Sequence, residues 1–133
     1  MKPQVESWML DNLMQIKDVT SCVVLSADGL LMGRNETLER DEADRFAASM
    51  SAMQSLSRIA NSEVQDVNSH WLQTLVEGTT GYIFLASAGE GAYVAVATGK
   101  TVDMEAIAFA IQQLVQRLGK YLSSPPREDA GRQ

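Results

Sequence analysis

The sequence predicts an α+β sandwich, in which a five-stranded antiparallel sheet carries helices on its faces. Three observations lead to this fold class. Apolar, partly β-branched runs separated by glycine-containing turns form two groups, and a long helical pattern lies between the groups. A strongly amphipathic helical pattern follows the last run. The predicted order is therefore helix, two strands, helix, three strands, helix.

Each predicted element rests on a repeating pattern of apolar residues and on the turn residues between elements. Asp28-Gly29, between two apolar runs, is a strong hairpin signal. Residues 78–81 and 89–91 each contain two glycines and are predicted to be turns. In order, we predict a helix over residues 3–17, strands over residues 21–26 and 30–34, a helix over residues 38–61, strands over residues 69–77, 82–87 and 92–98, and a helix over residues 103–122.

The ends of the helices carry further signals. Pro3 suits a first helical turn, because its missing N–H group is not needed there. Asp41 and Asp44 resemble a capping box near the start of the longest helix, although glutamate or glutamine is the usual partner. Residues 123–133 are polar and contain prolines, so we expect a disordered tail after one folded domain over residues 1–122.

The composition argues against several classes of function. The chain has 17 acidic and 11 basic residues, and its net charge of −6 disfavours nucleic acid, whose phosphates need a basic face. The single cysteine, Cys22, and the single histidine, His70, argue against an internal disulfide and a cysteine–histidine metal site. Met1 is followed by no apolar signal core, and no apolar run reaches the ~18 residues of a membrane span. We therefore expect a cytoplasmic protein without stable membrane insertion, metal or cofactor.

Some local motifs resemble catalytic or metal-binding sites, and each has a plainer structural interpretation that we favour. Gly99-Lys100-Thr101 after a strand is how a P-loop ends, but the motif would need its first glycine at residue 94, which is Val94. Cys22 fits a buried strand position better than a reactive thiol, and His70 fits a surface or interface position better than a general base. The acidic residues within 36–44 lack the spacing of a calcium-binding loop.

The most informative feature is an absence of charge in the longest predicted helix. Residues 46–57 form a stretch of twelve residues without a charge, where average composition predicts about three. A helix on a sheet buries only one stripe, so alanine, serine and methionine around the whole helix indicate burial on two sides. We expect the second side to contact the same helix of a second copy in a twofold dimer. The alternative is an uncharged helix that stays exposed.

A neighbouring strand is predicted to extend this dimer interface. Residues 69–76 contain no lysine, aspartate or proline, the residues that commonly protect an exposed sheet edge. This strand can therefore pair with its symmetry mate. The predicted interface residues are Ala43, Phe46, Ala47, Met50, Ser51 and Gln54 of the helix, and Trp71, Gln73 and Leu75 of the strand.

Three of these features together resemble the roadblock/dynein light chain family. They are the hairpin Val23-Val-Leu-Ser-Ala-Asp-Gly-Leu-Leu-Met-Gly33, the central helix rich in Ala, Ser and Met, and Gly91-Ala-Tyr-Val-Ala-Val-Ala97 before the last helix. The resemblance covers about residues 6–121 and implies a profilin-like form of the predicted fold. The chain is similar in particular to the small roadblock proteins of bacterial conservons, encoded beside a Ras-like GTPase and a histidine-kinase-like protein, and to a related bacterial polarity regulator.

The resemblance implies a noncatalytic signalling protein. It implies homodimerisation through the central helix and the third strand, and binding of a small Ras-like GTPase whose nucleotide cycle is altered, with a histidine-kinase-like protein as a further partner. The family has no catalytic residues to carry over, and nothing in the sequence distinguishes Arg34, Arg40, Arg45 or Arg58 as an arginine finger. The alternative function is a small-ligand sensor, because PAS-like and profilin-like domains have similar architecture.

Overall fold

A computed structural model of the chain describes residues 5–89 and 91–123. Its elements are the 3-10 helix η1 (Ser7–Leu10), α1 (Asp11–Met14), β1 (Val19–Ser26), β2 (Leu31–Arg34), α2 (Arg40–Val64), β3 (Gln73–Glu77), β4 (Gly81–Ser87), β5 (Ala92–Gly99) and α3 (Met104–Ser123). The predicted order of helices and strands and the α+β class are confirmed.

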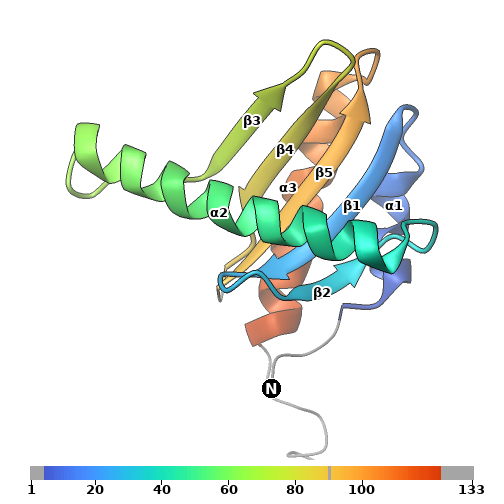
Figure 1. Ribbon diagram of the computed structural model, residues 1–133, viewed down its shortest axis with the longest axis horizontal. Coiled ribbons are helices and arrows are strands. Elements are labelled where there is room, and N and C mark those ends of the chain that lie inside the picture. Colours follow the sequence, from blue (N-terminus) through green and yellow to red (C-terminus); the bar gives the residue numbers. More distant parts are fainter. Residues whose placement is uncertain (1–4, 90, 124–133) are drawn as a thin grey trace, which may run out of the picture.

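The five strands form one antiparallel sheet with the order β2-β1-β5-β4-β3. The hairpin β1–β2 and the meander β3–β4–β5 join through the central pair of β1 and β5. Helix α2 crosses one face of the sheet, and α1 and α3 lie on the other face (Figure 1). In this arrangement β3 lies at one edge of the sheet and β2 at the other.

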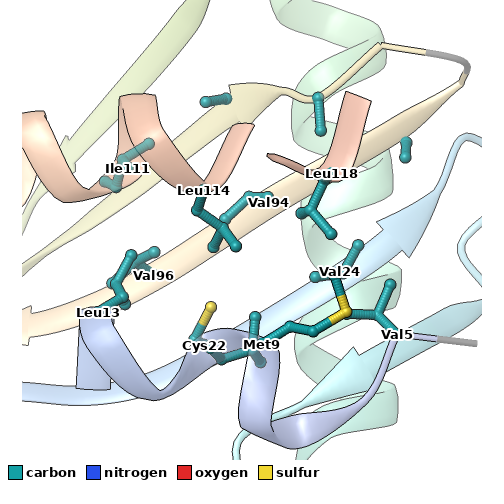
Figure 2. Packing of buried hydrophobic residues seen from close by; sticks show 14 of the residues in the cluster. Val5, Met9, Leu13, Cys22, Val24, Val94, Val96, Ile111, Leu114 and Leu118 are labelled. Carbon is teal, nitrogen blue, oxygen red and sulfur yellow. The ribbon is translucent and has the colours of Figure 1, made fainter. Parts of the chain in front are cut away.

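Each face of the sheet has its own hydrophobic core. Along β1, Val23 and Leu25 belong to the core under α2, whereas Cys22 and Val24 belong to the core under α3, as the twofold alternation of a strand requires. Figure 2 shows Val24 together with Leu114 of α3 in this second core. Because both faces are covered, residues 22–25 of β1 and 92–97 of β5 are continuously apolar, a pattern more typical of parallel sheets.

The N-terminal helix is shorter than predicted. Helical structure covers residues 7–14, in two short pieces, instead of residues 3–17. The backbone N–H of Val5 donates to the carbonyl oxygen of Met32 on β2, so this residue extends the sheet edge and cannot belong to a helix. The chain then turns at Asp18, which has a positive φ of 77°. Pro3 lies outside the described residues.

Other element bounds also differ from the prediction, and α2 ends at Val64 instead of residue 61. The capping box is not formed: the N-cap of α2 is Glu39, without a side-chain capping bond, and Asp44 pairs with Arg40 instead. Strand β3 begins at Gln73 instead of residue 69, because residues before it run beside α2, where Asn61 donates to Ser69. Helix α3 includes Ser123, and the remainder of the predicted tail lies outside the described residues.

Candidate dimer interface

The sheet-facing side of α2 contains four of the predicted interface residues. Ala43, Ala47, Met50 and Gln54 are no more than 4% exposed. The first three pack in the core that α2 forms with β1, β4 and β5 of the same chain. They are therefore not available to a second copy, which corrects their assignment. Their small or flexible side chains let the helix lie close to its own sheet.

One flank of α2 is occupied by contacts within the chain. The hydroxyl of Ser51 donates to the carbonyl oxygen of Ala27 in the β1–β2 turn at 2.7 Å. Further along this flank, Nη1 of Arg58 donates to the hydroxyl of Tyr93 at 3.1 Å. Ser51, another predicted interface residue, thus holds the helix against its own hairpin.

The opposite flank carries an uncharged stripe. The stripe consists of Phe46, Ser49, Met53, Leu56 and Ala60, at spacings of three and four residues, which place them on one side of a helix. Phe46 and Met53 are partly buried against the core under α2, and Leu56 is 65% exposed. Of the helix residues that we predicted, Phe46 lies in this stripe.

Strand β3 presents an open edge beside the stripe. In the described part of the chain it pairs only with β4, so the backbone groups of its outer side have no strand partner. Gln73 and Leu75, which we predicted at the interface, are exposed, with Leu75 at 49%. Trp71 is instead half-buried: its ring lies 6.1 Å from that of Tyr93, and its Nε1 donates to Thr74.

Several exposed apolar side chains come from the end of α2, the segment after it and β3. Of the large hydrophobic residues that are exposed in the described ranges, more than half lie between residues 56 and 75. The C-terminal turns of α2, which belong to this range, extend past the β3 edge of the sheet (Figure 1). The exposed large hydrophobic residues of this range are Leu56, Ile59, Val64, Val67, Leu72 and Leu75. They do not form one patch: Thr74 bonds to Ser57 of α2, so its neighbour Leu75 points to the opposite face of the sheet, and Ile59 lines a polar hollow on the other flank of α2.

The P-loop-like motif is a structural turn. The backbone N–H of Gly99 donates to the carbonyl oxygen of Asp18, and both the N–H and the hydroxyl of Thr101 donate to the carboxylate of Asp18. A side chain at residue 99 would lie 2.5 Å from that carboxylate, which explains the glycine. Lys100 pairs with Glu77 and lies 4.6 Å from the ring centre of Tyr82. The amides and the lysine thus already have partners, and no phosphate cradle exists here.

The other candidate residues are separated from one another. Cys22 is buried as predicted, and burial raises the pKa of its thiol to about 12. His70 is exposed on the segment before β3. Within the described ranges, no group of three or more His, Cys, Asp or Glu side chains is placed to hold a metal ion. None of the described helices is both long and apolar enough to cross a bilayer.

Comparisons with known proteins agree with this architecture. Residues 6–98 match the profile of the Roadblock/LC7 domain. The crystal structure of a Roadblock/LC7 domain from Streptomyces avermitilis has 30% sequence identity and a TM-score of 0.84, and the match covers 91% of this chain and 99% of that chain.

Two more distant structures share the fold. Myxococcus xanthus MglB has a TM-score of 0.80 at 11% identity, over 90% of this chain and 95% of that chain. The gliding protein MglB from Thermus thermophilus has a TM-score of 0.76 at 11% identity, over 86% of each chain. The comparison with functionally curated proteins gives no match.

Proposed function

The chain belongs to the Roadblock/LC7 domain family, and from this premise we propose that it is a cytoplasmic, noncatalytic homodimeric adaptor that binds a small Ras-like GTPase and modulates its nucleotide cycle. The observation that carries the proposal is the uncharged stripe of α2 beside the open edge of β3. The GTPase partner rests on the family resemblance.

The proposed dimer joins the same two elements of both copies. A twofold axis beside β3 would pair this strand with its symmetry mate and bring the two stripes together. Pairing would satisfy the open backbone edge, and contact between the stripes would cover side chains such as Leu56. A structure of MglB is described as having a tetrameric arrangement, which supports assembly as a property of this fold.

The proposed effect on the GTPase is conformational. Among the arginines named above, Arg34 donates to the carbonyl oxygen of Leu38 and Arg40 pairs with Asp44, whereas Arg45 and Arg58 have no carboxylate partner in the described ranges. No one arginine is therefore singled out as an arginine finger. We propose that the adaptor favours one conformation of the GTPase switch regions. The comparisons give no support to a histidine-kinase-like partner, and we do not propose it.

The test combines the mass of the protein with its effect on a GTPase. Light scattering of the purified protein should give about twice the mass of one chain. A small Ras-like GTPase of the same organism, loaded with GDP or with a GTP analogue, should form a complex with this protein in at least one state, and its rate of hydrolysis or exchange should change. A dimer that forms no complex and changes neither rate would leave the assembly standing and refute the regulatory function.

A further inference from the structure

A polar hollow of about 490 Å³ lies beside the C-terminal half of α2. Its wall combines residues of α2, the segment before β3, the end of β4 and the beginning of β5. The lining includes Arg58, His70, Trp71 and Tyr93 together with several serines, and it contains no aspartate or glutamate of the described residues. In a chain with a net charge of −6, this hollow therefore has a locally positive lining.

Arg58 is held in place by neutral partners. Its Nη1 donates to Oε1 of Gln54 and to the hydroxyl of Tyr93, each at 3.1 Å. Both partners are themselves buried, Gln54 at 2% and Tyr93 at 6% exposed. No carboxylate in the described ranges pairs with Arg58. The guanidinium is thus oriented but not neutralised, and its Nε and Nη2 retain N–H donors for a further acceptor.

We propose that this hollow binds a small molecule that carries an oxyanion, a phosphate or a carboxylate, on a planar ring. The free edge of the Arg58 guanidinium matches the two oxygens of such a group, and Ser87, whose hydroxyl oxygen accepts from the N–H of Gly89, lines the same space. Trp71 offers an aromatic wall for the ring. The volume falls within the range of small-molecule sites, about 300–1,000 Å³.

The hollow and the uncharged stripe lie on different flanks of α2. Arg58 and Ser62 lie on the flank of α2 that contacts Tyr93 and the hollow, whereas the uncharged stripe runs along the opposite flank. The stripe does not contribute to the hollow, and the ligand site does not depend on the proposed GTPase. The sequence did not reveal this site, because its parts come from four separated segments.

The test is a titration of the ¹⁵N-labelled full chain with phenyl phosphate at constant ionic strength, followed by NMR. The indole N–H of Trp71 and the Nε–H of Arg58 should shift together as the site fills. Phenol, which lacks the anion, and inorganic phosphate, which lacks the ring, should bind more weakly than phenyl phosphate. Benzoate in place of phenyl phosphate shows whether the site prefers carboxylate or phosphate.

Variants of residues at the hollow, with a matched control, test whether binding depends on Arg58. Arg58→Gln should weaken binding roughly 10-fold or more, because it removes a charge-assisted bond, whereas Arg45→Gln on the same helix should leave binding unchanged. Ser62→Glu places a negative charge at the hollow while keeping Arg58 and its partners. It should also weaken binding, and it replaces Arg58→Gln in the test if that variant fails to fold. Equal losses in Arg58→Gln and Arg45→Gln, or shifts located elsewhere, would overturn the proposal.

Discussion

The hydroxyl of Thr74 on β3 donates to the hydroxyl of Ser57 on α2 at 2.7 Å, and this bond joins the edge strand to the long helix. Thr74 also accepts the indole N–H of Trp71 at 2.8 Å. The three side chains form a short relay at the place where α2 crosses the edge of the sheet. The stripe on α2 and the open edge of β3 are therefore fixed relative to each other, and together they form one surface.

The first prediction concerns this relay. Thr74→Val keeps the shape and strand preference of residue 74 but removes both hydrogen bonds, leaving Trp71 and Ser57 without their partner. We expect the free energy of unfolding to fall by about 1 kcal/mol, measured by urea denaturation. Thr79→Val, in the exposed turn after β3, is the control and should change little. If both variants unfold like the original chain, the relay does not stabilise the edge strand.

The second prediction locates the dimer contact on α2. Ser49→Arg places a charge in the middle of the uncharged stripe, where a second copy would bury it without a partner. The dissociation constant should rise roughly 100-fold or more, and light scattering at low micromolar concentration should show the mass of one chain. The neighbouring Ala48→Arg lies on the solvent side of the helix and should remain a dimer. A dimeric Ser49→Arg protein would place the interface elsewhere.

The sequence could show that α2 is unusual, but not which of its sides meets a partner. Alanine and methionine occur both at Ala47 and Met50, which the sheet covers, and at Met53, which lies in the stripe. Small and apolar residues satisfy helix–sheet and helix–helix packing equally well, so residue type alone does not assign the sides. The spacing of three and four residues from Phe46 to Ala60 does mark one side of the helix. That side can be proposed as the dimer contact only once the side that faces the sheet is known.

The third prediction separates folding from assembly. Ala47 is fully buried between α2 and the sheet. Ala47→Arg would force a guanidinium into this core, which should cost more than about 4 kcal/mol and give insoluble or unfolded protein instead of a folded monomer. Circular dichroism and light scattering of the expressed protein would distinguish the two results. A folded, monomeric Ala47→Arg protein would return this residue to the dimer interface.

The fold was more predictable than the interface because alternation, glycine turns and amphipathicity act locally. Asp28-Gly29 correctly marked the first hairpin, and the apolar run at residues 92–98 correctly marked β5. The errors arose where distant segments decide the local structure. Val5 pairs with Met32 instead of starting a helix, and Asp18 binds the turn at residues 99–101, a contact across more than 80 positions that no local pattern reveals.

The fourth prediction concerns the turn that resembles a P-loop. Asp18→Ala removes the acceptor of the N–H and hydroxyl of Thr101, so the free energy of unfolding should fall by about 1–2 kcal/mol. Lys100→Ala should leave stability nearly unchanged, because its ion pair with Glu77 is exposed to solvent. Urea denaturation of the two variants measures both effects. A larger loss of unfolding free energy in Lys100→Ala than in Asp18→Ala would contradict the structural role assigned to Asp18.

The fifth prediction concerns the reactivity of Cys22. Its thiol is fully buried in the core under α3, and burial raises its pKa to about 12. At pH 8 a disulfide reagent such as DTNB should therefore label the native protein far more slowly than the protein in urea, because the thiolate is the reactive form. Rapid labelling of the native chain would show that β1 opens far more readily than its interior position in the sheet, between β2 and β5, implies.

The same raised pKa makes stability depend on pH in a defined direction. Because the folded-state pKa of Cys22 lies above the unfolded value, the unfolded chain loses this proton first as the pH rises. The stabilising contribution is complete below the unfolded pKa of about 8.5 and declines as the pH rises above it. Cys22→Ala removes the only thiol, so it should abolish labelling and also reduce the loss of stability between about pH 9 and pH 11, measured by urea denaturation. If the original chain and Cys22→Ala lose equal amounts of unfolding free energy over this pH range, other ionisable groups cause the loss.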